Sequence, residues 1–117
     1  MHNLDAMNPP RWTPISENRL YELLDESCQL MTDELRHLWQ LIHLRHAEIW
    51  QQRPWADEGC GFWVVATFSR SCIYFNDLSQ SFALSQFDRW GNIMEFDPTS
   101  RSLTELLTSL LAEPQTA

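Results

Sequence analysis

Apolar positions in the N-terminal half of the chain recur at the spacing of a helix. The first stripe is formed by Leu20, Leu24, Cys28 and Met31. Ser16 precedes this stripe as a residue type that caps helix N-termini, so an amphipathic helix is predicted from about residue 17 to 31. Thr32 is a second candidate N-cap, and the helical stripe after it continues past a break near Arg45 through Ala47, Ile49 and Trp50. Because Pro54 ends it, we expect helices from about 17 to 52.

The centre of the chain changes to the two-residue alternation of β-strands. Four short strands are predicted, at about 62–68, 72–75, 82–87 and 93–96, joined by turns rich in Ser, Asn, Asp and Gly. The first, from Phe62 to Phe68, is apolar on both faces, which indicates a strand that is covered on both sides. Such closely spaced strands predict an antiparallel meander.

A third helix follows the strands. Ser102 and Glu105 have the spacing of a capping box, and Pro114 ends the helical pattern, so a helix is predicted over 103–112. Its apolar face consists of Leu103, Leu106, Leu107, Leu110 and Leu111. The fold class is therefore α+β, with N-terminal helices, a four-stranded antiparallel meander and an amphipathic C-terminal helix packed on the sheet. Residues 16–113 are expected to form a single domain between an N-terminal arm (1–15) and a tail (114–117).

The charge balance restricts the class of partner. Sixteen acidic residues face eight basic ones, all of the basic residues are Arg, and the net charge is -8. Nucleic-acid binding requires clustered basic residues, so this composition argues against it and suggests either simple solubility or a basic protein partner. Three cysteines without CxxC spacing indicate reduced thiols, and we find neither a secretory signal nor an apolar run of membrane-spanning length. We therefore expect a cytoplasmic protein without membrane association.

Two groups of residues invite a chemical interpretation. His43 and His46, with His37 nearby, have a spacing that can converge on a metal ion, but no further ligands of recognised spacing accompany them. Cys60 lies in a loop as a candidate nucleophile, but the adjacent Asp57 and Glu58 would raise its pKa. The sequence thus predicts a non-enzymatic protein with no catalytic residues, no metal site and no cofactor.

Aromatic residues in predicted loops are the better candidates for a binding surface. Trp and Arg are enriched at binding hot spots, and Trp55 and the Arg89–Trp90 pair fall in connections rather than in the strand pattern. The predicted binding residues are Trp55, Asp57, Glu58, Asp77, Arg89 and Trp90. Two structural alternatives stay open: Trp90 covers the core, and Asn76–Asp77 serves turn formation alone.

The motifs Gly61-Phe-Trp-Val-Val-Ala, Tyr74-Phe-Asn-Asp and Gly91-Asn-Ile-Met-Glu resemble those of small uncharacterised bacterial proteins, some of which are similar to immunity proteins of polymorphic toxin systems. The resemblance covers roughly residues 38 to 96 and implies an interaction role without catalytic residues. The expected function is a cytosolic protein-binding module of the immunity-inhibitor type, with its oligomeric state left open. The alternatives are a secretion chaperone-like dimer, and a small ligand-binding or enzymatic domain with a concave polar pocket.

Overall fold

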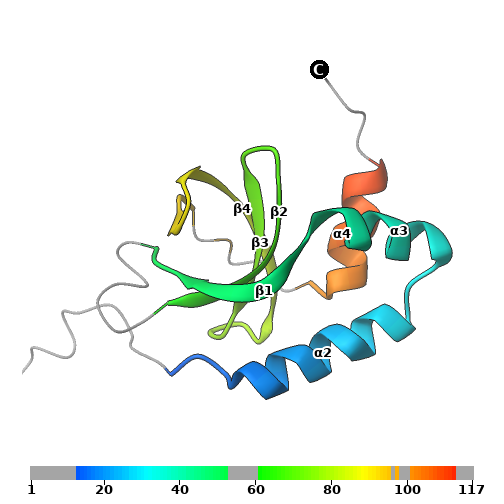
Figure 1. Ribbon diagram of the computed structural model, residues 1–117, viewed down its shortest axis with the longest axis horizontal. Helices are drawn as coiled ribbons and strands as arrows, with labels where there is room; N and C mark the ends of the chain where they lie inside the picture. The colour runs from blue at the N-terminus through cyan, green and yellow to red at the C-terminus, as the bar shows by residue number, and fades with distance from the viewer. Residues whose placement is uncertain (1–12, 53–60, 96, 98–100, 113–117) are drawn as a thin grey trace, which may run out of the picture.

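The computed structural model describes residues 13–52, 61–95, 97 and 101–112, which form an α+β fold (Figure 1). In chain order the elements are α2 (Glu17–Gln29), α3 (Asp33–Ile42), β1 (His43–Trp50), β2 (Phe62–Phe68), β3 (Ser71–Asn76), β4 (Ser81–Arg89), β5 (Asn92–Ile93) and α4 (Leu103–Ala112). In Figure 1, α2 runs below the sheet, and α3 and α4 lie together at its right-hand end. The predicted α+β class is confirmed.

The strands form one antiparallel meander in the order β1-β2-β3-β4-β5, so the sheet has five strands rather than the predicted four. The sheet curls until its two edges meet. Directly after β1, the Gln51 N–H donates to the Gly91 carbonyl oxygen at 3.0 Å, and the Ile93 N–H donates to the Gln51 carbonyl oxygen at 2.8 Å. We call this junction of Gln51 with Gly91 and Ile93 the seam. It joins residues about 40 positions apart and encloses the concave face of the sheet.

The additional strand is β1, and here the sequence prediction was wrong. Helices were expected to about residue 52, but α3 ends at Ile42 and the backbone of His43 is already extended, at φ -67° and ψ 146°. Trp50 pairs with Phe62 and Ile49 with Trp63 in an antiparallel ladder. Pairing with β2 gives the backbone N–H and C=O groups of β1 their hydrogen-bond partners and places the Trp50 side chain inside the curled sheet. Together these gains outweigh the local helical preference of the segment.

Two apolar cores lie on the two faces of the sheet. The helix-covered core contains Leu20, Leu24, Met31, Leu35, Trp39, Val65, Ala66, Ile73, Phe75, Phe82, Leu103, Leu106 and Leu107. The core inside the curl contains Trp50, Phe62, Val64, Cys72, Tyr74, Ala83 and Ile93. A bulge between Val64 and Ala66 turns successive residues of β2 toward the helices. The expectation that this strand is covered on both faces is therefore confirmed, as is the packing of α4 on the sheet.

The predicted helix caps are present. The Ser16 Oγ accepts from the Arg19 N–H at 3.1 Å, and the Thr32 Oγ1 accepts from the Leu35 N–H at 3.2 Å. At α4 the Ser102 Oγ accepts from the Glu105 N–H, and the Glu105 carboxylate accepts from the Ser102 N–H at 2.9 Å. Each cap satisfies N–H groups that a helix leaves without an internal partner. The bounds of α4 match the prediction, and α2 ends two residues earlier than expected.

The outer edge of β1 is held by α2. The Ala47 N–H donates to the Tyr21 hydroxyl oxygen at 3.0 Å, within a stretch where the pairing of β1 with β2 is irregular. An edge strand with unpaired amides can pair with another chain, and a side-chain acceptor at this position blocks such pairing. We expect Tyr21→Phe to lower the free energy of unfolding by about 1 kcal/mol, because the Ala47 amide loses its acceptor. Urea denaturation measures the loss, and faster hydrogen exchange at the Ala47 amide locates it. Unchanged exchange at this amide would contradict the assignment.

Candidate functional site

Trp90 lies at the open end of the curled sheet, in the turn between β4 and β5. Gly91 follows with φ 97°, a backbone conformation that side-chain-bearing residues rarely adopt, so the turn depends on glycine at this position. The indole of Trp90 packs edge-on against Trp50 at 5.0 Å and against Phe87 at 6.1 Å between ring centroids. It nevertheless stays 55% exposed. Trp90 therefore covers the end of the inner core with one part of its ring and presents the rest to solvent.

Glu48 fixes the orientation of this indole. Its Oε1 accepts from the Trp90 Nε1–H at 2.7 Å and from the Trp50 Nε1–H at 3.2 Å. One carboxylate oxygen thus joins β1 to the turn that follows β4, across 42 residues of sequence. Hydrogen bonds to a charged acceptor are stronger than those between neutral groups, so Glu48 restrains the orientation of the ring.

The sequence prediction missed Glu48 and Trp50. Both lie on β1, and the helical interpretation of that segment concealed that they are neighbours on one face. In a strand, residues two apart project from the same face, so a strand assignment alone would have placed the Glu48 carboxylate beside the Trp50 indole. The contact of Glu48 with Trp90 had no comparable local signal, since it depends on the closure of the sheet.

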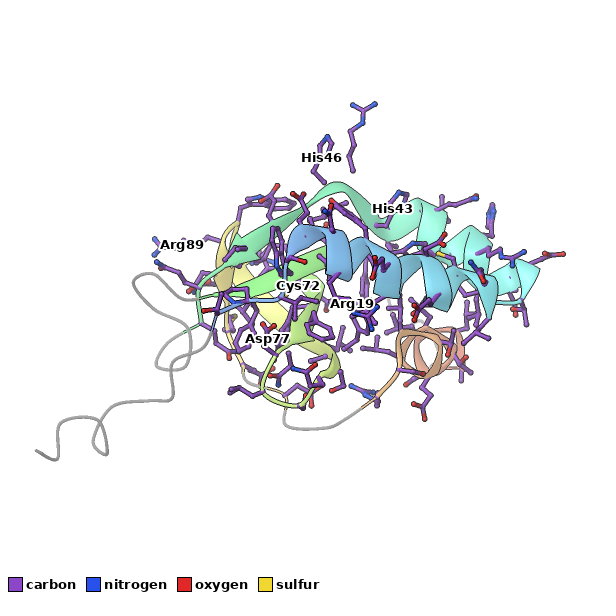
Figure 2. All side chains as sticks on the ribbon, turned by 90° about the horizontal axis from the view of Figure 1, so that it is seen from below. Arg19, His43, His46, Cys72, Asp77 and Arg89 are labelled. Atoms are coloured by element: carbon purple, nitrogen blue, oxygen red, sulfur yellow. The ribbon has the colours of Figure 1, made fainter. Side chains whose placement is uncertain are left out.

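Arg89 is the last residue of β4 and is exposed. It lines a hollow of about 330 Å³ together with Gln51, Asn92, Ile93 and Met94. Figure 2 shows the Arg89 side chain at the end of the molecule that lies away from α3 and α4. The structure therefore places Arg89, Trp90 and Glu48 around one end of the sheet, and we call these three residues the Trp90 surface.

Asp77 does not belong to this surface. It lies in the turn before β4, and a nine-residue strand separates its end of the sheet from Arg89 by roughly 25 Å. Its side chain is only 9% exposed, and its Oδ1 accepts from the Ile15 N–H at 3.0 Å. The preceding Asn76 accepts from the Leu78 N–H at 2.9 Å, as expected of turn chemistry. Asp77 thus fixes the chain before α2 to the sheet.

The other three predicted binding residues, Trp55, Asp57 and Glu58, lie outside the described residues, as does Cys60. Their segment connects Gln52, directly after the seam, to Gly61. Gly61 lies close to the end of β1. A Cβ at this position would overlap the Ile49 Cγ2 and lie 2.8 Å from the Trp50 carbonyl oxygen, so the close approach requires glycine. Their part in the binding surface stays a prediction.

The three histidines with the spacing of metal ligands lie on two elements. His37 is exposed on α3, and His43 and His46 are on β1 rather than on a common helix. The His43 Nδ1 lies 2.9 Å from the Trp39 carbonyl oxygen and its ring stacks on the Trp39 indole, whereas the His46 side chain points away from the molecule (Figure 2). Among the residues that the structure describes, no three His, Cys, Asp or Glu side chains are grouped as metal ligands.

Both described thiols are held in the protonated form. Burial raises the pKa of the Cys72 thiol to about 12, and Cys72 is fully buried inside the curl. Burial, with a smaller contribution from the Asp25 carboxylate, also raises the pKa of Cys28. A nucleophilic cysteine requires the opposite shift, because the thiolate is the reactive form. Neither residue has the environment of a catalytic thiol.

Comparison with protein-family models, with curated proteins and with solved structures finds no match to this chain. Among the described residues, no helix is both long enough and apolar enough to cross a membrane.

Proposed function

We propose that this protein is a cytoplasmic, non-enzymatic protein-binding module, of the type of an immunity inhibitor of a toxin, and that it binds a basic protein through the Trp90 surface. The observation that carries this proposal is the state of Trp90: more than half exposed, yet held by one hydrogen bond and two aromatic contacts. Rigid, partly exposed Trp residues with neighbouring Arg are typical of binding hot spots.

The charge of the chain supports a basic partner. The exposed acidic side chains of the first two helices are Glu17, Glu22, Asp25, Glu26, Asp33 and Glu34. Only Arg19 and Arg36 form ion pairs with them among the described residues, and these pairs are solvent-exposed. An acidic surface raises the rate of association with a basic protein, and a rigid aromatic anchor lowers the rate at which the complex dissociates. The resemblance of the strand motifs at Gly61, Tyr74 and Gly91 to immunity-like proteins points to the same type of function.

Capture of a partner from extract of the source cells tests the proposal. The immobilised wild-type protein should retain a partner protein. The Trp90→Ala variant should retain at least about ten-fold less of it, as expected for a hot-spot residue. Leu41→Ala is the matched control, because Leu41 is 72% exposed on α3, at the other side of the sheet from the β4–β5 turn (Figure 1). It removes an exposed apolar side chain without touching the Trp90 surface and should leave capture unchanged.

Circular dichroism must first show that the variants are folded. A double change, Asp57→Ala with Glu58→Ala, tests the part of the predicted surface that lies outside the described residues. If no protein is captured, or if the Trp90→Ala and Leu41→Ala variants capture it equally well, the Trp90 surface is not the binding site and the proposed function is wrong.

A further inference from the structure

Beside Trp90, the Glu48 carboxylate has an oxygen, Oε2, to which no described residue donates a hydrogen bond. Both of its hydrogen bonds from the indoles end on Oε1. Glu48 is exposed, and no basic side chain of the described residues forms an ion pair with it. Within the part of the chain that the structure describes, the Oε2 atom and the negative charge are therefore available to a donor from outside, next to an aromatic ring that is 55% exposed.

Among the described residues, the two that directly precede Trp90 in the chain carry opposite charges. Asp88 and Arg89 precede Trp90 in the chain, and the Asp88 Oδ1 accepts from the Asn92 side-chain amide at 2.7 Å. Arg89 lines the hollow with Gln51 and Met94. Counted over Glu48, Asp88 and Arg89, the formal charge is negative by one unit, within a chain of net charge -8. The surroundings therefore attract a cation.

A flat cation with several donors is well suited to contact the ring and the carboxylate at once. A guanidinium stacks on indole, donates through a planar fork to a carboxylate oxygen and is more weakly hydrated than an ammonium group. An ammonium group can pair with the carboxylate but cannot stack in this way. The chemistry of the pair thus favours arginine over lysine.

We propose that Trp90 and Glu48 together form the docking point for an arginine side chain of the protein partner. This inference rests on the proposed function and specifies the chemistry of its site. We take a protein as the source of the guanidinium, because the Trp90 ring is exposed in a surface turn. A side chain on the surface of a second protein can reach such a position. Arg89, one residue away, is available to a carboxylate of the same partner, so the two proteins would exchange opposite charges.

The test uses blocked pentapeptides with a central arginine, citrulline or lysine between glycines, titrated into the full-length protein. Citrulline has nearly the shape of arginine but no charge. Binding is followed by the NMR signals of the indole N–H groups, with those of Trp90 and Trp50 assigned by their loss in Trp90→Phe and Trp50→Phe. The arginine peptide should shift both signals and should bind several-fold more tightly than either the lysine or the citrulline peptide.

The Glu48→Gln variant isolates the contribution of the charge. It keeps an oxygen that can accept from the indoles but removes the negative charge, so the arginine peptide should bind roughly five-fold more weakly while the citrulline peptide is unaffected. Glu34→Gln is the matched control, because it removes one exposed carboxylate from α3. It should change the affinity less than two-fold.

Equal binding of the arginine and citrulline peptides, equal effects of Glu48→Gln and Glu34→Gln, or arginine-dependent shifts confined to other indoles would each overturn the inference. If the peptides fail in these ways while capture from extract still depends on Trp90, the proposed function stands and its site recognises another group. If the peptides discriminate as expected while no protein is captured, the arginine site stands and the proposed function fails.

Discussion

Trp50→Ala is expected to lower the free energy of unfolding by about 3–5 kcal/mol, the usual range for deleting a buried tryptophan. Trp50 is 1% exposed and is among the largest fully buried side chains of the molecule. Its ring contacts Phe87 at 5.2 Å and Trp90 at 5.0 Å between centroids, and it lies next to the seam. Removing the Trp50 ring would leave a cavity. Because the two edges of the sheet meet beside Trp50, this cavity would lie where the seam closes the inner core.

Urea denaturation of the two proteins measures this loss, and Trp50→Phe separates its causes. A phenyl ring keeps the aromatic contacts but cannot donate to Glu48, so this variant should lose about 1–2 kcal/mol. The alanine variant should also shift the NMR signal of the Trp90 indole N–H, although Trp90 itself is unchanged, because one of its supports is gone. A loss below about 1 kcal/mol for Trp50→Ala would mean that the inner core does not depend on this ring.

The sequence predicted the elements whose signals are local. Ser16, Thr32 and the Ser102–Glu105 pair cap helices as expected, and the strands from Phe62 to Arg89 follow from apolar alternation and turn residues. These signals act within a few residues, so they do not depend on how the sheet closes. Even the bounds of α4 could be predicted, because its cap and its leucine stripe agree.

The error at β1 has a definite cause. The more buried residues of this strand are Leu44, Ala47 and Trp50, three positions apart, which is the spacing of a helix face. That spacing arises because the pairing of β1 with β2 is irregular between His43 and Glu48, so the strand does not keep a two-residue alternation. Irregular strand pairing depends on the tertiary structure. In the sequence, the spacing of buried residues in such a strand is the same as that of a helix.

The candidate site was predictable only in part, for the same reason. Composition placed Arg89 and Trp90 in the turn; the structure puts Trp90 there, whereas Arg89 is the last residue of β4. The Glu48 contact joins β1, and the seam joins Gln51 directly after β1, to residues about 40 positions later, and both form only when the sheet curls. The two alternatives for Trp90 are also not exclusive, because its ring covers the inner core and is exposed at once.

Stability should fall steeply as the pH rises above about 9. Burial raises the pKa of Cys72 from its ordinary value of 9.0 to about 12, and burial is also the main cause that raises the pKa of Tyr74 from 10.0 to about 12. Between pH 9 and 12 the unfolded chain therefore releases these protons while the folded protein keeps them. The unfolded state binds fewer protons, so the free energy of unfolding decreases with increasing pH in this window and is unaffected by these groups below it.

The composition makes this window unusually clear to interpret, because the chain has no Lys. Its groups with ordinary pKa values between about 8 and 11 are thiols, two tyrosines and the terminal amine. At about 1.4 kcal/mol per pH unit, Cys72 alone should cost about 2 kcal/mol between pH 9 and 10.5, measured by urea unfolding at several pH values. Cys72→Ala should flatten the dependence from pH 9 upward, and Tyr74→Phe should flatten it only above pH 10. If the slope of Cys72→Ala equals that of the wild type, the thiol is not held protonated inside the curled sheet, and the inner core is more open than its packing indicates.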